Sequence, residues 1–155
     1  MKLVRLCAFF VFISMTLFAY EATKIEVENT SLDVPADWRV SHATALNRYE
    51  LISPEYVVPG SLHREKLNRD FTLDEYLKYS LEGIKKLMPA IRVIERKDNY
   101  HIFSAVMIGY EIVELQFFYL REQQGYILTF ALAKEEFDSY RDILFEISKS
   151  FKIGQ

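Results

Sequence analysis

The sequence predicts an α+β fold in which helices flank an antiparallel β-sheet. Strand-like segments occur in two groups, and each group is followed by a segment with helical periodicity rather than alternating with helices one by one. Half of the 155 residues are apolar, which suffices for one hydrophobic core. Two strongly apolar segments near the end are joined by a four-residue link, a spacing that favours an antiparallel hairpin.

The first group of predicted strands lies before residue 70. Lys24–Asn29 alternates polar and apolar residues, as a half-buried strand does. Residues 32–38 are interpreted as a strand end that runs into a turn, because Pro35 interrupts strand pairing. Ala45–Ser53 and Ser61–Asn68 are further strand candidates, and the loop between them holds two prolines and a glycine.

The first helix is predicted over residues 73–88. Thr72 is a natural N-cap, and Glu75 three residues later completes a capping box. Apolar residues then recur every three or four positions as far as Leu87, which predicts one buried face. Pro89 is expected to end the helix.

Four strands and a closing helix are predicted for the second half. The strands are Ile91–Lys97, Tyr100–Ile108, Ile112–Arg121 and Tyr126–Ala133. The third is apolar on both faces near its end, which indicates a central position in the sheet. The helix covers Glu135–Ser150, with an apolar stripe made of Phe137, Tyr140, Leu144, Ile147 and Phe151.

The first 19 residues have the pattern of a secretory signal peptide. A basic start precedes fourteen uncharged residues, Leu6–Ala19, whereas a membrane-spanning helix needs roughly 20. Cleavage after Ala19 or Ala22 would leave one exported domain over residues 24–153, in the periplasm or outside the cell. The alternative is an uncleaved helix that anchors the chain in the membrane.

Composition excludes several classes of protein. Cys7 is the single cysteine, so one chain can form neither a disulfide framework nor a cysteine-based zinc site. Cleavage after residue 19 removes Lys2 and Arg5 and leaves 17 basic against 22 acidic residues, a net charge of −5. A mildly acidic domain is a poor general binder of nucleic acid or anionic lipid, so no nucleic-acid partner is predicted.

The sequence contains no catalytic motif, and we predict that the protein is not an enzyme. The three histidines are His42, His63 and His101; they lack metal-ligand spacing and are interpreted as exposed, solvated side chains. No cofactor is predicted. A weak divalent-metal site that combines His42 or His63 with nearby acids stays open as an alternative.

Basic residues form two groups on predicted strands. Arg64 and Lys66 share one face of the first strand, and Arg92 and Arg96 share one face of another. If the two strands adjoin, these four residues would form a patch that binds a phosphate or an acidic partner. The alternative is a solvated sheet face that is balanced by neighbouring glutamates.

Trp38 and His63 complete the predicted partner-binding surface. His63 belongs to the loop region around residues 54–63, where an exposed face of the sheet is also expected to meet a partner. An exposed Trp38 would be a plausible anchor for that partner, whereas a buried Trp38 would belong to the core.

Four segments in order resemble the PsbP/Mog1-like fold group. They are S-L-D-V-P-A-D-W at Ser31–Trp38, F-T-L-D-E-Y-L at Phe71–Leu77, the apolar hairpin at residues 115–131, and the last helix with its closing Ser150–Phe151. Together they span nearly the whole exported part of the chain. The combination is most similar to small bacterial extracytoplasmic proteins of the DcrB type.

This resemblance implies an α/β/α sandwich around an antiparallel sheet and a non-catalytic role. Members of the group dock on other proteins: a photosystem II assembly, the Ran GTPase in nuclear members, and envelope functions linked to phage uptake in bacterial ones. With the signal peptide, it implies an exported binding or assembly module whose partner is an envelope protein or complex. The alternatives are a carrier of a small ligand or divalent metal, and a hydrolase with an unrecognised site.

Overall fold

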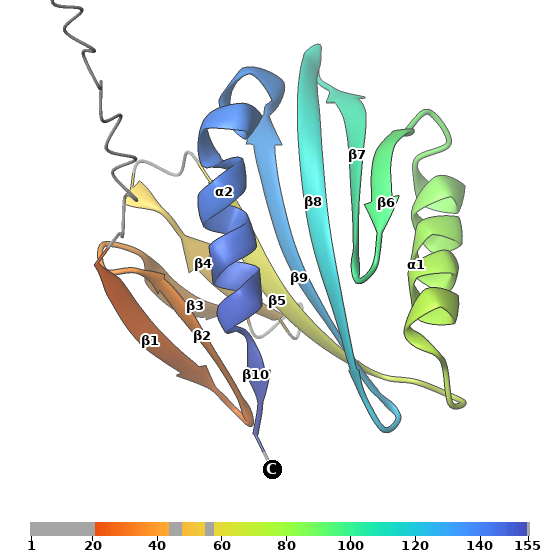
Figure 1. Cartoon of the computed structure of the whole chain (residues 1–155). Helices are drawn as coiled ribbons and strands as arrows, with labels where there is room; N and C mark the ends of the chain where they lie inside the picture. Colours follow the sequence, from red (N-terminus) through yellow and green to blue (C-terminus); the bar gives the residue numbers. More distant parts are fainter. Residues whose placement is uncertain (1–20, 44–47, 55–57, 155) are drawn as a thin grey trace, which may run out of the picture.

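The computed structural model describes residues 21–43, 48–54 and 58–154 (Figure 1). The predicted signal peptide and the cleavage point at Ala19 lie outside the described residues, as does the start of the predicted strand Ala45–Ser53. Among the described residues, no helix is both long and apolar enough to cross a membrane.

Seven antiparallel strands form the main sheet, in the order β3-β4-β5-β9-β8-β7-β6 (Figure 1). In chain order they are β3 (Arg39–Ala43), β4 (Arg48–Ile52), β5 (Pro59–Lys66), β6 (Arg92–Lys97), β7 (Tyr100–Met107), β8 (Tyr110–Arg121) and β9 (Gln124–Ala133). The predicted hairpin between β8 and β9 is confirmed, with Ile112 opposite Ala133 and Arg121 opposite Gln124. β8 lies inside the sheet, as its apolar sequence predicts.

A second sheet of three strands contains both ends of the described chain. It consists of β1 (Ala22–Val27), β2 (Thr30–Pro35) and β10 (Lys152–Ile153), with β2 in the middle. β2 is a full strand rather than the strand end predicted there, and Pro35 is its last residue, where a lost hydrogen bond matters least.

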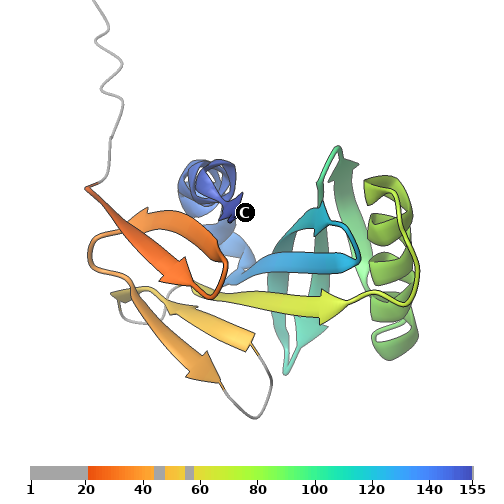
Figure 2. The ribbon, with the colours of Figure 1, turned by 90° about the horizontal axis from the view of Figure 1, so that it is seen from below.

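The two helices lie on opposite faces of the main sheet (Figure 2). They are α1 (Leu73–Leu87) and α2 (Lys134–Ser150). Consecutive residues of a strand point to opposite faces, and in β8 Phe117 belongs to the core beneath α2 while Phe118 belongs to the core beneath α1. The predicted arrangement of helices around an antiparallel sheet is therefore confirmed.

The larger core lies between α2, the small sheet and the main sheet. The predicted stripe of α2 is confirmed, because Phe137, Leu144 and Ile147 are buried in this core. Trp38 is buried here too, with its indole edge-on to the ring of Phe130 at a centroid distance of 6.3 Å. Trp38 is thus a core residue, and its prediction as part of a partner-binding surface is wrong.

The smaller core lies beneath the first half of α1. The capping box is present, since the Thr72 hydroxyl accepts from the amide of Glu75 at 3.3 Å and the Glu75 carboxylate accepts from the amide of Thr72 at 2.8 Å. Tyr76 and Leu77 are the buried helix residues. The prediction of a buried face as far as Leu87 is wrong: Leu87 is 85% exposed, because the apolar contacts of α1 are concentrated in its first two turns.

Candidate binding site

A groove of about 380 Å³ lies on the face of the sheet that α1 partly covers. Side chains alternate along β8, so Glu114 and Gln116 share this face with Phe118, which packs under α1. The groove lies on β4, β5, β9 and β8, and its polar lining residues are Arg48, Glu50, Ser53, Ser61, Glu114 and Thr129. Its volume is in the range of about 300–1,000 Å³ that small-molecule sites occupy.

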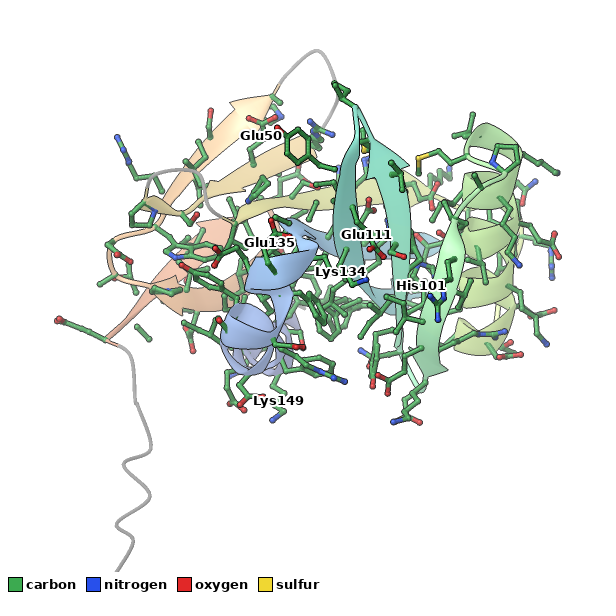
Figure 3. All side chains as sticks on the ribbon, turned by 90° about the horizontal axis from the view of Figure 1, so that it is seen from above. Glu50, His101, Glu111, Lys134, Glu135 and Lys149 are labelled. Atoms are coloured by element: carbon green, nitrogen blue, oxygen red, sulfur yellow. The ribbon has the colours of Figure 1, made fainter. Side chains whose placement is uncertain are left out.

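A row of polar side chains crosses five strands along this face. Glu50 is opposite Ser61, Ser61 is opposite Thr129, Thr129 is opposite Gln116, and Gln116 is opposite His101. The positions of Glu50 and His101 are marked in Figure 3. The antiparallel register therefore brings together five polar residues that are spread over 80 positions of the sequence, from 50 to 129, without any local motif.

Gln116 connects the groove to a buried histidine. Its amide nitrogen donates to Glu114 Oε1 at 2.5 Å, and its amide oxygen accepts from His101 Nε2 at 2.7 Å. His101 is fully buried, with its ring against those of Phe103 and Phe118. The prediction that His101 is exposed is therefore wrong. Burial lowers the pKa of His101, so this imidazole is neutral at neutral pH.

Arg48 lines the groove from β4, across the sheet from Glu114, and one of its donors is unsatisfied. Its Nη2 donates to Glu50 Oε1 at 3.2 Å. Its Nε is buried and has no hydrogen-bond partner among the described residues; among them, His101 Nδ1 is the other such buried side-chain atom. A buried donor without a partner costs free energy, and a bound molecule with an acceptor would recover it. The groove can therefore supply both a cationic donor from Arg48 and a carboxyl acceptor from Glu114.

The two predicted basic groups do not form one patch. Arg64 and Lys66 lie on β5, whereas Arg92 and Arg96 lie on β6 at the edge of the sheet. The strands β9, β8 and β7 lie between them, so the condition that the two strands adjoin is not met. His63, also on β5, is half-buried and lies opposite Arg48, next to the groove.

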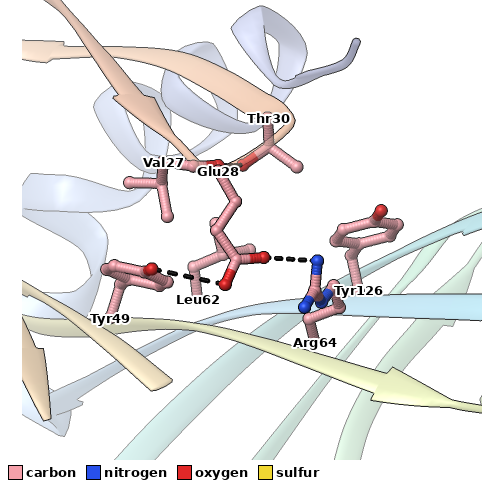
Figure 4. Close-up of a pocket in the computed structure, with 7 residues that line it drawn as sticks. All are labelled: Val27, Glu28, Thr30, Tyr49, Leu62, Arg64 and Tyr126. Carbon is pink, nitrogen blue, oxygen red and sulfur yellow. Dashed lines mark hydrogen bonds and ion pairs between the residues drawn. The ribbon is translucent and has the colours of Figure 1, made fainter. Parts of the chain in front are cut away.

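The arginine at position 64 forms part of a contact between the two sheets. Glu28, in the turn between β1 and β2, forms an ion pair with Arg64 and accepts from the Tyr49 hydroxyl at 3.4 Å (Figure 4). The pocket that they line has a volume of about 10 Å³, which is room for about one water molecule. This small pocket therefore belongs to the contact between the two sheets and is not a ligand site. Arg96 forms a comparable ion pair with Asp74 of α1.

Sequence reasoning missed the groove residues, although one signal for them exists. In the apolar segment I-V-E-L-Q-F-F of β8, Glu114 and Gln116 occupy alternate positions and so interrupt one face only. Two polar residues at a spacing of two in a central strand indicate a polar site within a covered face.

Replacing Glu114 by glutamine should raise the melting temperature at pH 7. Burial raises the pKa of Glu114 above its usual 4.5, and the hydrogen bond from Gln116 only partly opposes this. The folded state therefore binds this proton more tightly than the unfolded state, so stability is lost as the pH rises from the unfolded pKa through the folded pKa.

The difference in melting temperature between Glu114→Gln and the wild type should vanish below about pH 4. There Glu114 is protonated in both the folded and the unfolded state of the wild type. Thermal unfolding followed by circular dichroism from pH 3 to 8 measures this. The exposed Glu82→Gln on α1 is the control and should follow the wild type. Equal melting temperatures for Glu114→Gln and the wild type at pH 7 would contradict the expectation.

The domain is of mixed α+β class, and comparison with solved structures identifies its fold. No family model matches the sequence, and no curated protein matches it. The structure is similar to that of the Saccharomyces cerevisiae Ran-binding protein Mog1p, with a TM-score of 0.65 and 9% identity over 87% of this chain and 96% of that chain.

Two other similar structures come from bacteria. Cyanobacterial PsbP from Synechocystis has a TM-score of 0.61 and 9% identity, over 89% of this chain and 95% of that chain. LpqN, which is involved in cell envelope biogenesis of Mycobacterium tuberculosis, has a TM-score of 0.56 and 14% identity, over 87% of this chain and 91% of that chain. The chain therefore has the PsbP/Mog1-like fold, as predicted. The finer resemblance to DcrB-type proteins stays a prediction.

Proposed function

We propose that this protein is an exported, non-catalytic binding module of the cell envelope that holds an extended segment of a partner protein in its groove. The observation that carries the proposal is that one groove of the sheet is lined by both Arg48, whose Nε has no hydrogen-bond partner among the described residues, and the half-buried carboxyl of Glu114. In an extended segment the N–H donor and the carbonyl acceptor of one residue lie on the same side, so such a segment can satisfy both residues.

Two further observations support this proposal. The signal-like segment at residues 1–19 favours export. Among the proteins of similar fold, LpqN is involved in cell envelope biogenesis and Mog1p binds Ran. Fold similarity alone does not transfer a function, so the groove residues carry the argument.

In-cell photo-crosslinking from the groove tests the proposal. A benzoylphenylalanine in place of Ser61, which lines the groove, should capture one recurrent envelope protein. The same group in place of the exposed Glu82 on α1 should not capture it. Cell fractionation of the full chain establishes its compartment. A chain that stays in the cytoplasm, or equal capture from both positions, would contradict the proposal.

The captured segment, made as a synthetic peptide, then allows the groove chemistry to be measured. Losing a hydrogen bond to a charged donor costs about 1.5–3 kcal/mol, which weakens binding about 10- to 150-fold. We therefore expect Arg48→Leu to raise the Kd by that factor in calorimetry. The control Arg39→Leu, on the edge strand β3 and outside the groove, should leave the Kd unchanged.

A small-ligand carrier is the second candidate, because the volume of the groove also suits a small molecule. It predicts that native mass spectrometry of the purified chain detects a bound small molecule that Arg48→Leu releases. It also predicts that the crosslinker at Ser61 captures no protein.

A further inference from the structure

Two-residue turns join four pairs of neighbouring strands. The first residue of each turn has a left-handed backbone; these residues are Glu28 (φ 51°), Asp98 (φ 36°), Ile108 (φ 51°) and Glu122 (φ 53°). Such a backbone is accessible to glycine, asparagine and aspartate, and is particularly unfavourable for β-branched side chains. Three of the turns begin with a polar residue, and the turn between β7 and β8 begins with an isoleucine.

Ile108 gains no burial in return for this strained backbone. It is 97% exposed, and its neighbours Val106, Met107 and Tyr110 are exposed as well. Together with Gly109 they form an apolar tip at the end of the β7–β8 hairpin (Figure 1). A strained, exposed, apolar residue stabilises nothing in the isolated chain, which points to a contact outside it.

We infer that the apolar tip, Val106–Tyr110, inserts into the surface of a lipid bilayer. The tip is the convex end of a hairpin, whereas a stable protein interface needs about 800 Å² and some 20 residues on each side. A bilayer accepts an apolar loop without a matching pocket. The hydroxyl of Tyr110 suits the headgroup region, where tyrosine side chains are enriched.

The surroundings of the tip fit this orientation. The end of α1 lies at the same end of the molecule (Figure 1), and there the exposed Leu87 follows Lys85 and Lys86. Lysine side chains can place their apolar stems in the interface and their ammonium groups in water. These residues of α1 would therefore approach the membrane interface together with the apolar tip.

Charge at this end of the molecule is mixed. Glu111, next to the tip, is paired with Lys134 at 2.6 Å, and Glu135 follows in the first turn of α2 (Figure 3). Insertion should therefore depend on apolar contact and should occur on vesicles of phosphatidylcholine alone, without anionic lipid.

A fluorescent reporter at the tip tests this in the full chain. Ile108→Trp adds a second indole to a chain whose single natural tryptophan, Trp38, is buried. With phosphatidylcholine vesicles the emission of the introduced indole should shift to the blue. Brominated acyl chains, which quench indoles inside the bilayer, should then reduce it.

The matched control is Tyr79→Trp, at an exposed position of α1 eight residues before Leu87. That position is about 12 Å along the helix from its end, and its indole should not be quenched. Because both variants carry the same N-terminal segment, vesicle binding through that segment affects them alike. No quenching in Ile108→Trp, or equal quenching in both variants, would overturn the inference.

A second variant separates the fold from the contact. Asparagine tolerates the left-handed backbone, so Ile108→Asn should raise the melting temperature. In a protein that reports through Tyr110→Trp, the same change should abolish quenching by brominated vesicles. A lowered melting temperature, or quenching that persists, would overturn the inference.

Discussion

Replacing Phe118 by alanine should lower the free energy of unfolding by about 3–5 kcal/mol, the cost of removing a large aromatic side chain from a closed core. Phe118 is fully buried in β8 beneath α1. Its ring lies edge-on to Tyr76 at a centroid distance of 5.4 Å and to His101 at 4.8 Å. The cavity left by the ring would therefore weaken the contact of α1 with the sheet and remove one wall around the buried imidazole. Equilibrium urea denaturation followed by circular dichroism measures the loss.

A second phenylalanine of the same core provides the control. Phe71 precedes α1, is half-buried and packs on Tyr76 and Tyr79. Because its ring is partly in water already, Phe71→Ala should cost clearly less than Phe118→Ala. Similar losses for the two variants would show that the core beneath α1 is not closed over Phe118 as the structure has it.

Elements with local signals could be predicted from the sequence. Thr72 and Glu75 hydrogen-bond to each other across one helical turn, so the start of α1 depends on four consecutive residues. The hairpin of β8 and β9 follows from two long apolar strands with a short link. By contrast, β3 has a single branched apolar residue, Val40, within R-V-S-H-A, and alternation cannot be recognised there. β3 is a strand because it pairs with the neighbouring strand β4.

The candidate groove could not be predicted, because it depends on register between distant strands. Glu114 becomes a groove residue because β9 places Ala131 opposite it and β5 continues the same face with Ser61. His101 is a polar residue near the start of a strand in the sequence, and it is buried because Phe103 of the same strand and Phe118 of the next strand pack on its ring. The prediction of a basic patch was wrong for the same reason. The order of strands in the sheet separates the two basic groups by three strands, and alternation along a strand does not encode that order.

The second large effect is expected at Gly125, where the Tyr76 side chain of α1 lies directly against the sheet. A β-carbon built on Gly125 would lie 2.6 Å from Cζ of Tyr76 and would also overlap its hydroxyl. Tyr76 is fully buried and donates a hydrogen bond to Glu65 at 2.7 Å, directly across from Gly125 in the sheet. Gly125→Ala should therefore displace Tyr76, break this bond and cost about 3 kcal/mol, the upper end of the usual penalty for overpacking.

Two control variants distinguish a cost that comes from the contact with Tyr76 from a cost that comes from the loss of a glycine as such. Gly83, in α1, has open space around its position, so Gly83→Ala should instead stabilise the protein by up to about 1 kcal/mol through helix propensity. In a Tyr76→Leu background the ring is gone, so Gly125→Ala should change the free energy of unfolding by less than about 0.5 kcal/mol. A change of that size is within the usual deviation from additivity in double-mutant cycles. Urea denaturation of the four proteins in this cycle measures the coupling. An undiminished cost in the Tyr76→Leu background would mean that Gly125 is required for a reason other than room for Tyr76, and that α1 is held to the sheet by its other contacts.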